Sequence, residues 1–265
     1  MDVAVLYGKI AIVTGASRGI GETIAKRFAA EGAAVAVAAR TTDPEQSRLP
    51  GTIGDTVTAI INEGGTAVAI PTDLAKPEDR RHLVAETTRL LGAPDILVSN
   101  AAVSYFMPVA DFSSRRYELM FAVQVQAPFE LAQLVLPGML ERGRGWILNV
   151  SSIAARHPSV PPGRFAIGST VYGMCKAALE RFSTGLAAEL YEDNIAVNAL
   201  SPTLVVPTPG TIFHHLTTED DPNSEPPTVM AEAALALCHA EPRSLTGRIT
   251  YSQDILRELG AAAEG

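Results

Sequence analysis

The chain has 265 residues, of which 47% are hydrophobic and 19% charged, and its formal net charge is −8. This composition is typical of a globular chain with a sizeable core, and its acidic balance argues against nonspecific nucleic-acid binding, which needs a basic face. Two cysteines are too few for a disulfide framework or a cysteine metal cage. No apolar run reaches the length of a membrane span, and the start MDVAVLYGK lacks a basic segment followed by an apolar run. We therefore expect a soluble, cytoplasmic protein with no metal, nucleic-acid or membrane partner.

Short apolar runs alternate with helical patterns along the chain. Most of the runs lack strict alternation, which is typical of strands buried on both faces. The runs are KIAIVTG, AAVAVAAR, TAVAIPTD, DILVSNA, GWILNVSS and IAVNALSP. Helices are predicted between them, at about residues 20–31, 54–64, 77–91, 112–141, 171–191 and 228–239. This alternation predicts an α/β fold, a parallel sheet with helices on both faces.

The first apolar run leads directly into the glycine-rich segment TGASRGIGE. Gly15, Gly19 and Gly21 stand where a strand turns into a helix, and glycine there lets backbone N–H groups approach a pyrophosphate at the helix N-terminus. A glycine-rich turn can also be purely structural. The strand before it and the helix after it favour a dinucleotide site.

The end of the second strand should face the adenosine ribose of such a cofactor. The sequence there is VAVAARTT, with Arg40 and Thr41 in place of an acidic residue, and Arg18 adds a second cation from the glycine-rich segment. A guanidinium suits the 2′-phosphate of NADP, whereas an acidic residue would suit the 2′-hydroxyl of NAD. This charge pattern favours NADP(H), unless Arg40 is simply a solvated residue at the strand end.

From Gly8 to about Ser252 these features resemble the classical short-chain dehydrogenase/reductase family. The resemblance rests on TGASRGIG, SNAA, NVSS, YGMCK and VNALSP, in the family's order, and RLPGTIGDTVTAI is similar to the hydroxysteroid-dehydrogenase-like members. It implies a single Rossmann domain over residues 1–265, with a doubly wound parallel sheet of about seven strands. It also implies interconversion of a carbonyl and an alcohol with NAD(P) as cofactor, and a homodimer or homotetramer built through the helix of Tyr172 and the helix before it.

The resemblance also assigns roles to single residues. Ser152, Tyr172 and Lys176 match the family's catalytic residues, and Gln124 stands where the family usually has an asparagine. Asp73 would touch the adenine, and the segment after Pro202 would lie over the nicotinamide. The residues expected at the cofactor are Gly15, Ser17, Arg18, Gly19, Ile20, Gly21, Arg40, Thr41, Asp73, Leu74, Asn100, Ala101, Ala102, Tyr172, Lys176, Pro202, Thr203 and Val205.

Tyr172 and Lys176 are four residues apart, which places both side chains on one face of a helix. A free tyrosine has a pKa near 10, too high for efficient proton exchange at neutral pH. A nearby lysine cation is expected to lower that pKa, and Ser152 to hydrogen-bond the substrate oxygen. The alternative is an accidental pair on an exposed surface.

The chain departs from the family's pattern at several places. Gln124 replaces the asparagine, the segment HPSVPPGRFAIGST lengthens the connection between Ser152 and Tyr172, and Thr203 replaces the usual glycine after Pro202. The segment 203–228 is long, acidic and proline-rich. We expect it to form an irregular lid over a fairly apolar substrate. Two function classes follow: an NADP(H)-dependent oxidoreductase, or a catalytically weak NADP(H)-binding sensor or scaffold motivated by Gln124.

Overall fold

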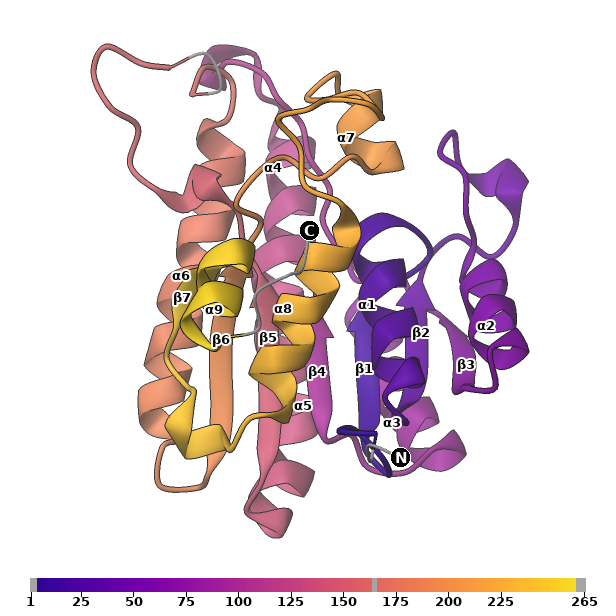
Figure 1. The fold of residues 1–265 in the computed structure, drawn as a ribbon. Coiled ribbons are helices and arrows are strands. Elements are labelled where there is room, and N and C mark those ends of the chain that lie inside the picture. Colours follow the sequence, from indigo (N-terminus) through magenta and orange to yellow (C-terminus); the bar gives the residue numbers. More distant parts are fainter. Residues whose placement is uncertain (1–3, 164–165, 261–265) are drawn as a thin grey trace.

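A computed structural model describes residues 4–163 and 166–260 of the chain. Within these residues seven strands form one sheet in the order β3-β2-β1-β4-β5-β6-β7, with every neighbouring pair parallel (Figure 1). The fold class predicted from the sequence, a doubly wound parallel sheet of about seven strands, is confirmed. The strands are β1 (Ile10–Thr14), β2 (Ala34–Ala39), β3 (Thr66–Pro71), β4 (Ile96–Ser99), β5 (Gly145–Val150), β6 (Ile195–Ser201) and β7 (Ile249–Tyr251).

The central strands are covered on both faces, which explains their unbroken apolar sequences. All residues of β4, β5 and β6 are buried. Two apolar clusters flank the sheet, one around Phe28 and Trp146 and the other around Leu131 and Met139. The indole of Trp146 lies in this core and donates a hydrogen bond to the backbone oxygen of Ala240 over 2.9 Å.

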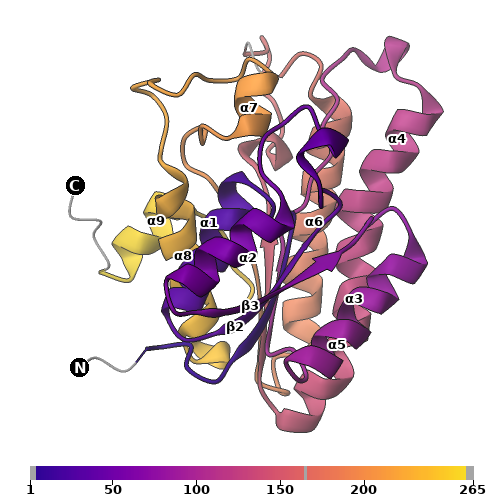
Figure 2. The ribbon, with the colours of Figure 1, turned by 90° about the vertical axis from the view of Figure 1, so that its right-hand side faces the viewer.

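The helices divide into one layer on each face of the sheet (Figure 2). One layer holds α1 (Gly19–Ala30), α2 (Ile53–Asn62), α8 (Pro227–His239) and α9 (Ser252–Glu258). The other holds α3 (Pro77–Leu90), α5 (Ala127–Arg142) and α6 (Thr170–Glu189). The predicted segments differ from these bounds by one or two residues, except at the fourth helix. Short 3₁₀ turns occupy Pro44–Gln46, Val109–Asp111, Ile153–Ala155 and Pro242–Ser244.

The fourth predicted helix is interrupted in its middle. It consists of α4 (Ser114–Phe121), a π-helical turn (Ala122–Gln126) and α5. Together they form a continuous helical segment, Ser114–Arg142, of 29 residues, which is long and apolar enough to cross a membrane by length and composition alone. The expectation concerned uninterrupted apolar runs, and this segment is longer because polar residues such as Gln124 and Glu130 interrupt its apolar ones; 44% of its most apolar window is buried inside the protein. One side of this segment packs against the sheet.

The predicted lid is more ordered than its sequence indicates. It contains the short helix α7 (Pro209–Phe213) and a parallel bridge between Val205 and Ser224. Buried Glu225 accepts hydrogen bonds from Ser252 over 2.6 Å and from Gln253 over 2.9 Å, which ties the lid to α9. Two residues of the insertion before Tyr172, 164 and 165, lie outside the described residues.

Candidate active site

The glycine-rich turn between β1 and α1 is packed closely against the end of β4. A Cβ on Gly21 would lie 2.4 Å from Nδ2 of Asn100, and one on Gly15 would lie 2.7 Å from Cα of Ala101. Gly15 also has a φ of +65°, which favours glycine. Glycine is thus required here by close approach of the chain to itself.

The amino terminus of α1 offers donors suited to a dinucleotide pyrophosphate. Arg18 occupies the N-cap position and its side chain makes no capping hydrogen bond, so the first N–H groups of this 12-residue helix are not capped. Such a helix start attracts phosphate through its N–H groups and its dipole. Among the predicted neighbours, Ser17 is buried and Ile20 packs against the core.

Asn100 joins β4 to the glycine-rich turn. Its amide donates to the backbone oxygens of Thr14, over 2.9 Å, and Gly15, over 3.2 Å. The side chain of Thr14 in turn accepts hydrogen bonds from the backbone N–H groups of Asn100 and Ala101. Asn100 therefore fixes the two strand ends relative to each other, while Ala102 beside it is exposed.

At the ribose end, the two predicted cations have different surroundings. Arg40 is exposed at the end of β2. The guanidinium of Arg18 is partly buried and donates to protein acceptors, among them Oγ of Ser17 over 3.3 Å and Oγ1 of Thr41 over 3.0 Å. Burial, and then repulsion from Arg40, lower the pKa of Arg18. The sequence predicts two cations for a phosphate, whereas the structure leaves Arg40 the more accessible of the two.

The predicted adenine contacts follow the outermost strand, β3. The backbone N–H of Asp73 donates to Asp79 over 2.8 Å, and Oδ1 of Asp73 accepts from Ala75. Leu74 is buried, and its backbone oxygen accepts from buried Arg80 over 3.0 Å. These contacts order the segment at the carboxyl end of β3, which lies beside the carboxyl end of the neighbouring strand β2.

The helix α6 brings the three predicted catalytic residues together. Tyr172 and Lys176 lie one turn apart on it, and Nζ of Lys176 is 5.6 Å from the centroid of the Tyr172 ring. That ammonium donates to the backbone oxygen of Val150 over 2.8 Å, at the end of β5. Ser152 follows two residues later, and a Cβ on Gly173 would be only 2.6 Å from the backbone oxygen of Ala154. The helix is therefore pressed against the turn that carries Ser152.

The ionisation of this group differs from the expectation based on sequence. Burial raises the pKa of Tyr172, and the hydrogen bond with Ser152 opposes that rise. Burial also lowers the pKa of Lys176 to about 8, against the opposing influence of Cys175 and Glu180. The predicted lowering of the tyrosine pKa by lysine is thus wrong for this structure, because the ammonium is bonded to Val150 and burial of the phenol dominates.

Gln124 lies in the π-helical turn and is 1% exposed. Its Nε2 donates to the backbone oxygen of Val103 over 3.0 Å. Its Oε1 is buried and has no hydrogen-bond partner among the described residues. π-Helical turns occur often at functional sites, and an unpaired buried oxygen is a natural acceptor for an ordered water.

The residues predicted at the cofactor from Pro202 onward form hydrogen bonds with later parts of the chain. Pro202 is partly buried, and the N–H of Thr203 donates to Oγ of Ser252 over 3.0 Å. The backbone oxygen of Val205 accepts from Glu225. A Cβ on Gly19 would be 2.9 Å from Cγ2 of Thr208, so the start of α7 lies directly against the glycine-rich turn.

Two aromatic residues that sequence reasoning missed connect the lid to Tyr172. The ring of Phe106 packs edge to face on Tyr172, with centroids 5.5 Å apart, and His214 packs on Phe106 at 5.3 Å. His214 is thus part of an aromatic contact, and within the described residues no three His, Cys, Asp or Glu side chains gather as a metal site would need. No sequence signal joins Phe106 to His214, because they belong to separate loops.

Glu180 is a further residue that the sequence analysis missed. It accepts a hydrogen bond from Oγ of Ser151 over 2.7 Å, and burial raises its pKa. With Lys176 one turn earlier, α6 therefore holds two consecutive residues, Val150 and Ser151, just before Ser152. Its spacing of four residues from Lys176 is a signal that could have identified it.

Comparison with known proteins identifies the family and agrees with this fold. A family model described as short chain dehydrogenase matches residues 9–214. The chain is 37% identical to Dehydrogenase/reductase SDR family member 4 of Homo sapiens over 201 residues, 76% of this chain and 67% of that protein. It is 31% identical to Hydroxysteroid dehydrogenase-like protein 2 of Danio rerio over 255 residues, 96% of this chain but 59% of that protein.

A solved structure extends the likeness to three dimensions. A metagenomic short-chain oxidoreductase in complex with NADP superposes with a TM-score of 0.75 at 26% identity, covering 93% of this chain and 97% of that one. The chain belongs to the short-chain dehydrogenase/reductase family of oxidoreductases, as the motifs predict.

Proposed function

We propose that this protein is an NADP(H)-dependent oxidoreductase that interconverts a carbonyl and an alcohol, with Tyr172 as the acid–base group. The observation that carries the proposal is the placement of Tyr172 and Lys176 on one face of α6, against the turn that holds Ser152. A phenol, an ammonium and a hydroxyl in one place can protonate an alkoxide and support the charge left behind.

The residues divide the chemical work as follows. When bound, NADP(H) supplies or accepts the hydride. The hydroxyl of Tyr172 gives its proton to the substrate oxygen during reduction, and the hydroxyl of Ser152 donates a hydrogen bond to the same oxygen. Lys176, whose ammonium lies 5.6 Å from the centroid of the tyrosine ring, is the cation that faces the resulting phenolate. Oε1 of Gln124 accepts a hydrogen bond from a water, and through this water the proton of Tyr172 is replaced after each turnover.

The choice of NADP(H) is supported by the cation at the end of β2. Arg40 is exposed there, and no acidic residue adjoins it in the segment AARTT. A guanidinium binds a phosphate with two parallel hydrogen bonds. Changing Arg40→Asp should weaken NADPH binding far more than NADH binding, measured by titration. Equal losses for both cofactors would remove this support.

The substrate is an apolar ketone, aldehyde or alcohol. The segment over the site carries Leu204 and Phe213, which are 39% and 50% exposed, and Phe106 lies against the catalytic tyrosine. Such side chains favour an apolar group beside the reacting carbon. We further propose that residues 203–228 close over the bound substrate and exclude water.

A turnover screen tests the enzyme proposal. The oxidation of NADPH is followed by absorbance with ketones and aldehydes of graded size, and the reverse reaction with the matching alcohols. Turnover that rises with the apolar surface of the substrate is the expected result. Binding of NADPH without turnover of any compound would favour the alternative, a cofactor-binding sensor or scaffold.

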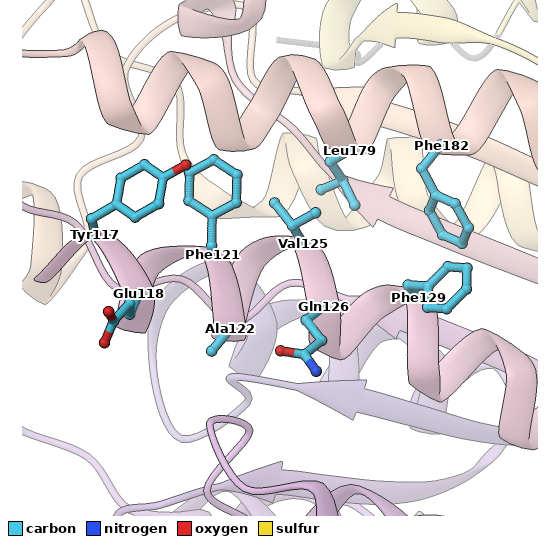
Figure 3. A pocket seen from close by; sticks show the side chains of 9 residues that line it. All are labelled: Tyr117, Glu118, Phe121, Ala122, Val125, Gln126, Phe129, Leu179 and Phe182. Carbon is cyan, nitrogen blue, oxygen red and sulfur yellow. The ribbon is translucent and has the colours of Figure 1, made fainter. Parts of the chain in front are cut away.

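We also propose that the chain forms a homodimer through the outer face of α4, α5 and α6. A groove there is mostly apolar, and Figure 3 shows Phe121, Val125 and Phe129 facing Leu179 and Phe182 of α6, while Glu118, Ala122 and Gln126 point away from α6. Phe129 and Phe182 pack with ring centroids 5.7 Å apart, and Phe129 is nevertheless 46% exposed. The lining residues are Tyr117, Glu118, Phe121, Ala122, Val125, Gln126, Phe129, Leu179 and Phe182.

In a two-fold symmetric dimer the same patch of each copy faces the other. Glu118 is the one charged residue among those that line the groove, so two copies can bring the patch together with little repulsion between like charges. Phe129→Glu should convert the dimer to a monomer in light scattering at micromolar concentration. Ile61→Glu is the matched control, because Ile61 is 55% exposed on α2, on the other side of the sheet. A parent protein that is already monomeric would refute the dimer.

A further inference from the structure

The guanidinium of Arg18 makes five hydrogen bonds, one for each of its N–H groups. Nε donates to Ser17 over 3.3 Å. Nη1 donates to Oγ of Ser47 over 3.0 Å and to the backbone oxygen of Leu49 over 2.9 Å. Nη2 donates to Oγ1 of Thr41 over 3.0 Å and to the backbone oxygen of Gly51 over 2.8 Å. Four of these five acceptors belong to residues 41–51, which we name the ribose loop.

The ribose loop has hydrogen bonds within itself, around the turn Pro44–Gln46, but few contacts besides those of Arg18 join it to the rest of the chain. None of its residues is buried, so it gains little from apolar packing. The backbone N–H of Ile53 donates to Thr41 and closes the loop at its base. At Gly51, with a φ of +93°, a Cβ would lie 2.5 Å from the backbone oxygen of Ser17. The loop therefore rests on the glycine-rich turn, and Arg18 joins its start, middle and end.

We propose that Arg18 is a positioning residue that fastens the ribose loop against the glycine-rich turn, and that Arg40 alone binds the 2′-phosphate. The second part rests on the proposed function, whereas the first does not. To bind a phosphate with two N–H groups, Arg18 would have to release two of its protein acceptors. Arg40 is exposed at the neighbouring strand end and gives up no such contacts.

The shape of the guanidinium explains why arginine is needed. Its planar fork reaches acceptors on three sides at once, from Ser17 to Ser47 and Gly51. A lysine ammonium is a point charge with three donors and cannot span the same set. Arg18→Lys should therefore behave like Arg18→Met in holding the loop, although it keeps the positive charge. If Arg18 bound a phosphate instead, Arg18→Lys would retain part of that binding, because lysine keeps the positive charge.

Proteolysis reports on the loop without any cofactor. The bond between Arg48 and Leu49 is a trypsin site, and it lies between two residues that Arg18 binds, Ser47 and Leu49. Both Arg18 variants should be cut there at least about tenfold faster than the parent protein, since cleavage follows the population of the open loop. The cut is quantified by mass spectrometry, and circular dichroism confirms that each variant is folded.

Two other arginines serve as controls for loss of charge. Arg40→Met removes the neighbouring cation, and Arg81→Met removes an exposed cation on α3. Cleavage at Arg48 should be unchanged in both. Ser47→Ala removes one acceptor while keeping Arg18, and should accelerate cleavage by a smaller factor. Cleavage of Arg18→Met and Arg18→Lys at the parental rate would overturn the positioning role.

Cofactor titration tests the second part. In Arg18→Met the dissociation constants of NADPH and NADH should rise by similar factors, because a wall of the site is loosened for both. In Arg40→Met the NADPH constant should rise at least about tenfold more than the NADH constant, as expected for a charge-assisted pair. A loss confined to NADPH in Arg18→Met would overturn the assignment to Arg40 alone. If the parent protein binds neither cofactor, the proposed function fails, whereas the proteolysis still decides the role of Arg18.

Discussion

The glycine-rich turn and the catalytic group both lie at the end of the sheet where the parallel strands have their carboxyl ends, but they are built in opposite ways. Around the turn, main-chain atoms approach so closely that a Cβ on Gly21 would be 2.4 Å from Asn100. Around the catalytic group, polar side chains are buried and some of their atoms have no partner within the described chain. Oε1 of Gln124, in the π-helical turn, is such an atom.

This difference separates two kinds of precision. In the cofactor half, the close approach of main-chain atoms leaves no room for a side chain, so glycine is required at Gly15 and Gly21. The catalytic half depends on the charge and hydrogen bonding of side chains in a buried environment, where the pKa of Lys176 falls to about 8. Substitutions should therefore damage the first half through folding and the second through chemistry.

The largest effect is expected in the catalytic half. Tyr172→Phe removes the proton donor while keeping the ring that packs on Phe106. Turnover should fall by at least about 100-fold, the contribution of a positioned general acid. Cofactor affinity and melting temperature should stay close to the parental values, because the packing is retained. Retention of more than a few per cent of the rate would assign the proton to another group.

Gly21→Ala should act in the opposite manner. The added Cβ meets Nδ2 of Asn100 and the backbone oxygen of Gly15, at 2.4 and 2.5 Å, so the turn must open. We expect a loss of about 2 kcal/mol in the free energy of unfolding, measured with urea, as for other overpacked sites. Gly210→Ala is the matched control, because its Cβ would be 3.8 Å from Thr208. Equal stability of the two variants would contradict the close packing.

Gln124 tests whether the unpaired buried atoms take part in chemistry. Gln124→Ala should slow turnover by at least about tenfold, less than the loss of a positioned general acid costs, because Gln124 acts on the proton through a water. Gln124→Asn should retain much more activity, because it keeps both the acceptor and the donor. Both variants disturb the contact with Val103. A loss of stability without a change in rate would make the position one of helix packing only.

The pH dependence of stability tests the buried lysine. The pKa of Lys176 is about 8 in the folded protein against an ordinary value of 10.5, so the unfolded chain binds the proton more tightly between these limits. The free energy of unfolding should therefore rise with pH across this window relative to Lys176→Met, by about 1 kcal/mol between pH 8 and 9. Parallel stability curves for the two proteins would place the ammonium in a more solvated environment.

Much of the fold could be predicted from the sequence because its signals are local. The apolar runs mark six strands, and helices such as α1 and α6 begin within one residue of their predicted starts. The π-helical turn at Ala122–Gln126 was missed, since nothing in its apolar pattern marks a change of hydrogen bonding. Helix α7 was missed because the lid's prolines and acids resemble an irregular loop; its Thr208 cap and Pro209 are the signal that could have identified it.

For the site, the sequence determined which residues stand at each strand end. Gly15, Gly21, Ser152, Tyr172 and Lys176 are recognisable because their spacing is set by a turn or by one turn of helix. Only the tertiary structure decided what surrounds them. Arg18 reaches residues up to 33 positions away, and Lys176 bonds to a strand 26 positions before it. Hydrogen bonds and burial across such separations depend on how the layers pack, and no local pattern records them.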